Sequence, residues 1–122
     1  MDQATRRAAL RTALATALGA TVPVHDEATA AISDERFVVV SWLSTTVDRT
    51  QAVHTFTIEC VATDADRFAT RDAICRTVMV TTNALEGFGR PSATTGLVTI
   101  GGQDYDRMAV VTITATDDPI ST

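Results

Sequence analysis

The chain has 122 residues, of which 45% are hydrophobic and 20% charged, a composition typical of a globular domain rather than a disordered segment. We expect one domain over residues 1–122. The formal net charge is −5 and all ten basic residues are arginine, so bulk charge does not favour nucleic-acid binding. The first twenty residues begin with an acid and carry arginines inside their apolar pattern, which disfavours a signal peptide and excludes a membrane span.

The first predicted element is a helix over about 4–18. It is indicated by an apolar stripe with a spacing of four residues, formed by Leu10, Leu14 and Leu18. Asp2 or Thr5 suits the start as a capping residue, and Gly19 suits the end. The segment 21–26 that follows is extended, and Pro23 restricts it to a sheet edge or a connector.

A long hairpin is predicted over about 37–62, with strands at 37–47 and 53–62. The first strand is apolar on both faces, since Phe37 and Val39 alternate with Val38 and Val40. Two short helices do not easily cover both faces, so we expect a neighbouring subunit to cover one of them. The alternative is that the helices of the same subunit cover both faces.

The second half of the chain predicts a helix over about 64–83 and a hairpin over about 97–116. Thr63 begins a capping-box spacing, and one helix face is predicted to pack on the sheet through Phe68, Cys75, Val78, Met79 and Thr82. Glycines and Pro91 predict a flexible loop over 85–95. The tail 117–119 is expected to fray.

Together these elements predict an α+β fold in the order α-β-β-α-β-β. The expected sheet is mostly antiparallel and four-stranded, built from 37–47, 53–62, 97–101 and 106–116, with the helices packed on it.

Residues able to do chemistry are sparse. The sequence has no P-loop, dinucleotide-binding glycine motif, nucleophile elbow or zinc-protease motif. His25 and His54 have no ligand-like spacing to Cys60 and Cys75, and both cysteines are interpreted as small buried hydrophobes in a reducing compartment. We therefore expect no enzymatic activity, no catalytic residue, no metal site and no cofactor.

Surface residues carry the functional hypothesis instead. Trp42 on the Val-rich strand suits an interface anchor. Asp48 and Arg49 place opposite charges at the hairpin tip, which suits an orienting polar contact. Arg67 and Arg71 on the second helix are possible partners for acidic residues of a neighbour. We expect these five residues to belong to an oligomer or partner interface.

The order of elements resembles the siphophage tail terminator family, also known as minor tail or tail completion proteins. The resembling segments are RRAALRTALATAL, VPVHDEA, FVVVSWLSTTVDRTQAVHTFTIECVA, DADRFATRDAICRTVMVTTNAL and LVTIGGQDYDRMAVVTITAT. The resemblance covers nearly the whole chain as pattern and order, without a diagnostic short motif. Head-closure and head–tail joining proteins share this shape, and a small bacterial α+β domain that binds a ligand or a protein stays an alternative.

The resemblance implies a structural virion protein of the tail, assembled in the host cytoplasm and not bound to a membrane. Its subunits would form a hexameric ring that caps the tail tube protein, ends tube polymerisation and contacts the head–tail connector protein. DNA would pass the lumen without specific binding, which suits an acidic chain. Loop position suggests lumen-lining acids at Asp48, Asp104, Asp106 and the pair Asp117-Asp118.

Overall fold

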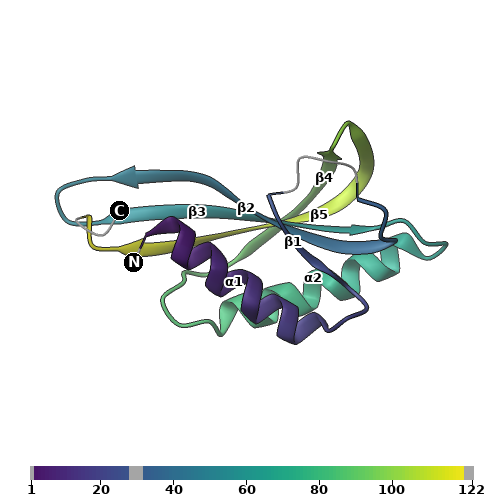
Figure 1. The fold of residues 1–122 in the computed structure, drawn as a ribbon, viewed down its shortest axis with the longest axis horizontal. Coiled ribbons are helices and arrows are strands. Elements are labelled where there is room, and N and C mark those ends of the chain that lie inside the picture. Colours follow the sequence, from purple (N-terminus) through teal and green to yellow (C-terminus); the bar gives the residue numbers. More distant parts are fainter. Residues whose placement is uncertain (1, 28–31, 120–122) are drawn as a thin grey trace.

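The computed structural model describes residues 2–27 and 32–119. The fold is α+β, with two helices, α1 (Gln3–Leu18) and α2 (Arg67–Asn83), packed side by side on one face of a five-stranded sheet (Figure 1). The strands are β1 (Val24–Asp26), β2 (Arg36–Val47), β3 (Ala52–Ala62), β4 (Ser92–Ile100) and β5 (Gln103–Asp117). Neither described helix combines the length and the apolar character needed to cross a lipid bilayer.

The sheet has one strand more than the four predicted. Its order is β1-β2-β3-β5-β4, and all neighbours are antiparallel except β1, which pairs parallel with β2. The extra strand lies at the sheet edge, one of the two positions that Pro23 allowed. The carbonyl of Pro23 accepts a hydrogen bond from Val38 N at 2.9 Å. Three residues are too few for an alternating pattern, so the sequence could not distinguish this strand from a connector.

Helix α1 begins and ends close to the predicted bounds. The Asp2 carboxylate accepts a hydrogen bond from Thr5 N at 2.9 Å, which satisfies one of the free donors of the first turn. Gly19 ends the helix with a φ of 74°, and its N–H donates to the Ala15 carbonyl at 3.0 Å. This positive φ explains the glycine, because other residues adopt it at a cost.

Helix α2 begins at Arg67, three residues after the predicted start, and the capping box at Thr63 is wrong. The Thr63 hydroxyl donates instead to the Glu35 carbonyl at 3.2 Å. The Asp64 carboxylate accepts from Thr70 and from Arg36. Both side chains are therefore used to fasten the turn before the helix to neighbouring segments.

The buried face of α2 is also rotated from the prediction. Ile74, Val78 and Thr82 are the buried residues of the helix, whereas the Phe68 side chain is 36% exposed. Cys75 and Met79 lie at the border of the core and are partly buried. The prediction failed for Phe68 because the buried residues of α2 all lie after its first two turns.

The main core lies between the sheet and the helices. Its fully buried side chains come from α1 and from the helix-facing positions of the central strands, among them Leu10, Leu14, Val38, Val40, Phe56, Ile58, Val111 and Ile113. Burial of this many aliphatic and aromatic groups is the main stabilising term of such a domain.

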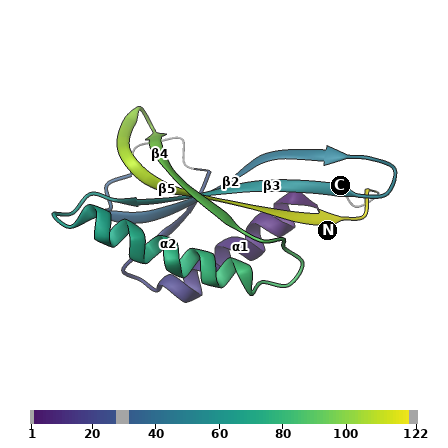
Figure 2. The ribbon, with the colours of Figure 1, turned by 180° about the vertical axis from the view of Figure 1, so that it is seen from behind.

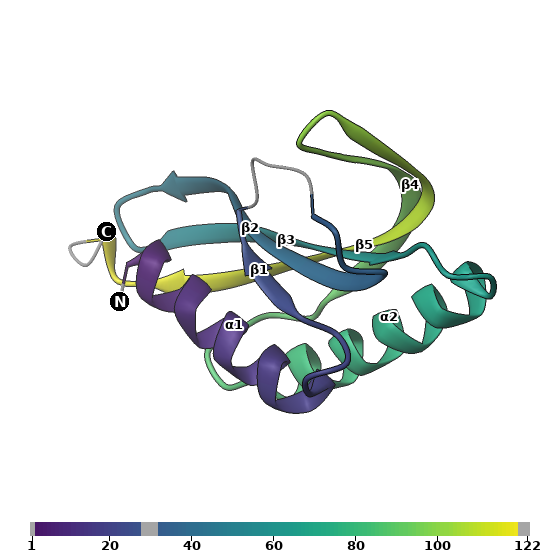
Figure 3. The same ribbon diagram turned by 45° about the vertical axis from the view of Figure 1, so that its right-hand side comes forward.

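A second, smaller core covers the other face of the sheet. There the tip of the β4–β5 hairpin curls over the strands on the side away from the helices (Figure 3). The residues buried in this way are Phe37, Val39, Val61, Val98, Ile100, Tyr105 and Met108. The expectation that a neighbouring subunit covers one face of the first predicted strand (37–47) is therefore wrong for residues 37–40, which the chain covers by itself.

The curl of the hairpin has a local origin. The pairing of β4 with β5 is irregular between Gly96 and Val98, and Arg107 opposite this point has a φ of 56°. Arg71 of α2 donates a hydrogen bond to the Arg107 carbonyl. An extra residue in one strand bends a hairpin, and the arginine from α2 fixes the bent segment to the helix layer.

The loop predicted over 85–95 is shorter than expected, because β4 already begins at Ser92. Gly89 N donates to the Thr114 carbonyl at 2.7 Å, and Phe88 packs against the main core. The predicted fraying of the tail is also wrong at Asp117, which is the last residue of β5 and pairs with Ala52.

Candidate interaction surface

The part of the β2–β3 hairpin that extends beyond β1 carries three large apolar side chains that are exposed to solvent. We call residues 41–55 the arm; it runs to one end of the long axis of the molecule (Figures 1 and 2). Trp42, Leu43 and Val47 on β2 are 41%, 62% and 55% exposed. Exposed apolar groups that lie together on a surface are characteristic of contact sites.

The tip of the arm is a turn organised by Asp48. The carboxylate oxygen Oδ1 accepts hydrogen bonds from Thr50 N at 2.7 Å and from Gln51 N at 2.9 Å. These bonds lower the pKa of Asp48 because they favour the charged carboxylate, and the bonds from Thr50 have the largest effect. The tip therefore carries a fixed negative charge next to Arg49.

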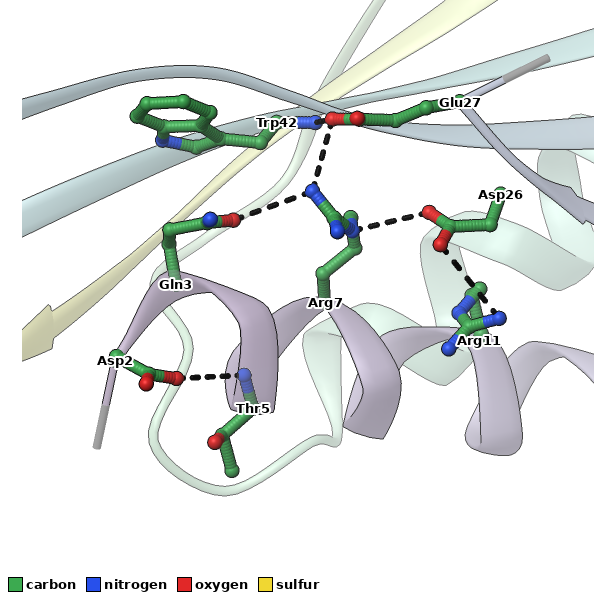
Figure 4. A network of polar contacts seen from close by, with 8 residues as sticks. All are labelled: Asp2, Gln3, Thr5, Arg7, Arg11, Asp26, Glu27 and Trp42. Atoms are coloured by element: carbon green, nitrogen blue, oxygen red, sulfur yellow. Dashed lines mark hydrogen bonds and ion pairs between the residues drawn. The ribbon is translucent and has the colours of Figure 1, made fainter.

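The base of the arm is tied to β1 and α1 by an acidic and basic network (Figure 4). The Glu27 carboxylate accepts from Trp42 N at 2.8 Å and from Arg7 Nη1 at 2.9 Å. Arg7 also contacts Asp26 at 3.0 Å between Nε and Oδ1. Where strand β1 ends, the Glu27 carboxylate thus accepts the hydrogen bond of the next backbone N–H on the outer edge of β2, that of Trp42.

A second network lies under the arm and is mostly buried. The Arg6 guanidinium makes two hydrogen bonds to the Asp117 carboxylate, at 3.0 and 2.6 Å. The His54 Nε2 lies 3.3 Å from Asp117 Oδ2, and the His54 Nδ1 lies 2.9 Å from the Thr45 hydroxyl. Arg6 therefore links α1 to the ends of three strands at the arm.

Thr45, His54 and Asp117 lie in a row, but their geometry is not that of a catalytic triad. The Trp42 indole donates to the Thr45 hydroxyl at 2.9 Å, so that hydroxyl is left to donate to Nδ1, and the imidazole proton belongs on Nε2. Nε2 is buried and faces Asp117 without hydrogen-bond geometry. With the histidine side chain 1% exposed, a substrate has no access to either ring nitrogen, and the network is structural.

The arginines predicted on α2 lie elsewhere. The guanidinium groups of Arg67 and Arg71 lie 4.7 and 4.9 Å from the centre of the Phe68 ring. Arg71 donates hydrogen bonds to the Asp72 carboxylate at 2.8 Å and to the Arg107 carbonyl. Exposed Arg67 and Phe68 form a cation–π platform at the start of α2, whereas Arg71 is mostly occupied within the chain.

The five residues proposed for an interface thus form two groups rather than one. Trp42, Asp48 and Arg49 lie on the arm, at one end of the long axis. Arg67 and Arg71 lie near the start of α2, at the other end (Figure 1). Of the acids proposed to line a lumen, Asp117 is excluded, because its side chain is 6% exposed and paired with Arg6.

The two cysteines, far apart in sequence, come together between β3 and α2. A hydrogen bond from the Cys60 thiol lowers the pKa of Cys75 to about 7, whereas the same contact and burial raise the pKa of Cys60. Cys60 is fully buried as predicted and Cys75 is partly buried. Within residues 2–27 and 32–119, no group of three His, Cys, Asp or Glu side chains is placed to hold a metal ion.

Sequence reasoning missed the residues that fix the arm. Arg6 and Asp117 are separated by 111 positions, and no spacing links residues so distant. Glu27 follows a three-residue strand that was not predicted as such. The one available signal was His54, a polar residue inside an apolar strand pattern, which implies a buried partner.

Comparison of the chain with protein-family models and with curated protein sequences finds no match.

Proposed function

We propose that this chain is a structural protein of a tailed phage that resembles the siphophage tail terminators. In this proposal its copies form a ring, hexameric as the resemblance implies, which caps the tail tube, ends tube polymerisation and joins the tail to the head connector. The ring would assemble in the host cytoplasm and remain in the virion tail.

The arm is the observation that carries this proposal. It presents Trp42, Leu43 and Val47 to solvent, and the Glu27 and His54 networks hold it in place from both sides of β2. A fixed apolar projection with an ordered polar tip suits protein–protein contact, because little entropy is lost when it binds.

The proposal is tested in a phage that lacks this chain. Electron microscopy of the lysate should show tails of variable length and few joined to heads, and wild-type protein supplied in trans should restore uniform tails. Uniform tails that fail to join heads would favour a head-closure or joining role instead. Uniform tails joined to heads would contradict the proposal.

The alternative of a small bacterial binding domain is tested by the same complementation. The groove between α1 and α2, lined by Leu18, Val22, Thr70 and Ile74 among others, has a volume of about 200 Å³, and a groove beside Val80 and Arg90 has about 350 Å³, at the low end of the range for ligand pockets. A chain restricted to ligand binding would leave tail length and head joining unchanged when it is removed.

A further inference from the structure

The first half of β4 is an open strand edge. Ser92, Ala93, Thr94 and Thr95 are all exposed, so neither face of the strand is covered there. In the described part of the chain, β4 is the last strand of the sheet and pairs with β5 alone. Residues 92–100 contain no charged residue, although charges and proline are the usual protection of sheet edges.

The arm offers a second open edge. Strand β1 pairs with β2 over Val38, Val39 and Val40, and the Glu27 carboxylate takes the next outward donor, Trp42 N. Beyond that point, within the described ranges, β2 pairs with β3 alone. Residues 41–47 also contain no charged residue, and 44–47 form a regular stretch after the irregularity between Trp42 and Ser44.

We propose that two copies of this chain join by antiparallel pairing of arm residues 45–47 of one copy with residues 93–95 of the next copy. The inference rests on the proposed function, since it describes how the subunits of the ring contact one another. Each copy carries one surface of each kind, so the contact is head-to-tail and repeats around a ring. Pairing would satisfy the backbone donors and acceptors that both edges expose.

Side chains at the two edges are complementary in this alignment. Val47 of the arm would meet Ala93, which lies on the helix-facing side of β4, beside a groove of about 350 Å³ lined by Met79, Val80, Asn83, Arg90 and Pro91. Val80 is 66% exposed in this groove, so the contact of the two valines removes apolar surface from water on both copies. The Asp48 carboxylate would lie near Arg90, which places opposite charges together at the end of the pairing.

Two exposed leucines mark the other end of the pairing. Leu43 and Leu97 are 62% and 63% exposed, and each stands at the irregular position of its strand. Pairing of 45–47 with 93–95 puts residue 43 opposite residue 97. Leu43 and Leu97 of neighbouring copies would therefore be in contact.

Cross-linking tests the pairing directly. Leu43→Cys and Leu97→Cys are made separately in a Cys75→Ser background, mixed at high protein concentration and treated with a short bis-maleimide. We expect a covalent dimer in the mixture and none with either variant alone. A dimer of Leu97→Cys alone would mean that β4 pairs with β4 and would overturn the proposal, as would the absence of a dimer in the mixture.

Charge variants test the same contact without cysteine. Arg90→Glu, and Asp48→Asn, which keeps the oxygen that accepts the turn hydrogen bonds, should each weaken self-association about fivefold in sedimentation equilibrium. Arg76→Glu, which makes the same charge change as Arg90→Glu on an exposed position of α2, is the control and should leave association unchanged. Equal weakening by all three variants would contradict the Asp48–Arg90 contact.

The outcome separates this inference from the proposed function. Closed rings in electron microscopy without the 43–97 cross-link would overturn the edge pairing and leave the ring intact. The cross-link together with normal, head-joined tails in a phage that lacks the chain would overturn the function and leave the pairing intact.

Discussion

Arg6 and Asp117 join the two ends of the chain in a two-bond ion pair, with side chains 14% and 6% exposed. Arg6 also lies over the Phe88 ring at 5.5 Å and against Gly87, where an added Cβ would collide with Arg6 Nη1. One guanidinium therefore fastens α1, the loop after α2 and the end of β5 beneath the arm. A planar guanidinium can make these contacts at once, which a lysine ammonium could not.

Removal of the Asp117 charge should destabilise the protein. Asp117→Asn leaves Arg6 buried without its anion, and we expect a loss of about 3 kcal/mol in the free energy of unfolding by urea at neutral pH. Asp106→Asn is the control, because the Asp106 side chain is 81% exposed, and it should change stability by less than about 0.5 kcal/mol. Equal stability of the two variants would show that the ion pair contributes nothing.

The same carboxylate predicts a pH dependence. Arg6 holds the pKa of Asp117 below its ordinary value in the folded protein. The contribution of the Arg6–Asp117 ion pair to the stability of the folded protein is therefore fully present above the unfolded-state pKa of about 3.9. It is lost as pH falls through the lower pKa that Asp117 has in the folded protein. Unfolding curves from pH 7 to pH 2 should show an acid-induced loss in the wild type that is smaller in Asp117→Asn. A parallel loss in both would assign the acid sensitivity to other groups.

The buried face of α2 is tested by a pair of truncations. Ile74 is 4% exposed and Phe68 is 36% exposed, so Ile74→Ala should cost about 2–4 kcal/mol through the lost burial and the cavity. Phe68→Ala should cost about 1 kcal/mol, because the ring contacts mainly the two arginines. Chemical denaturation measures both, and a larger loss for Phe68→Ala would restore the helix face expected from sequence.

Arg71 should stabilise the second core through the Arg107 carbonyl. Arg71→Ala removes that hydrogen bond and the contact with Phe68, and we expect a loss of about 1–2 kcal/mol. Hydrogen exchange should become faster at residues 97–108, which form the curled hairpin. Arg76→Ala on the exposed side of the same helix is the control, and an identical exchange pattern in both variants would contradict the role of Arg71.

The cysteine pair predicts selective thiol chemistry. With a pKa of about 7, Cys75 should react with iodoacetamide at a rate that rises to half its maximum near neutral pH. Buried Cys60 should stay unlabelled in the folded protein, as peptide mass spectrometry can determine. Cys60→Ala removes the hydrogen bond to the thiolate and should move the Cys75 midpoint to higher pH. An unchanged midpoint would mean that the two thiols do not interact.

The sequence by itself determined the elements whose signal is local. The four-residue spacing that includes Leu10 and Leu14 indicated α1, and alternation along 53–62 indicated β3, because each pattern reports the period of its own backbone. The apolar character of residues 37–40 on both faces was likewise evident, and both faces are buried.

The tertiary structure alone decided what covers those faces and what holds the arm. The second core depends on a bend near Arg107 that no periodicity encodes, so a neighbour was expected where the chain covers itself. The pairing of Arg6 with Asp117 spans nearly the whole chain, and Phe68 looked like core until the position of α2 over the sheet was known. Such contacts arise from packing between elements, whereas sequence patterns describe one element at a time.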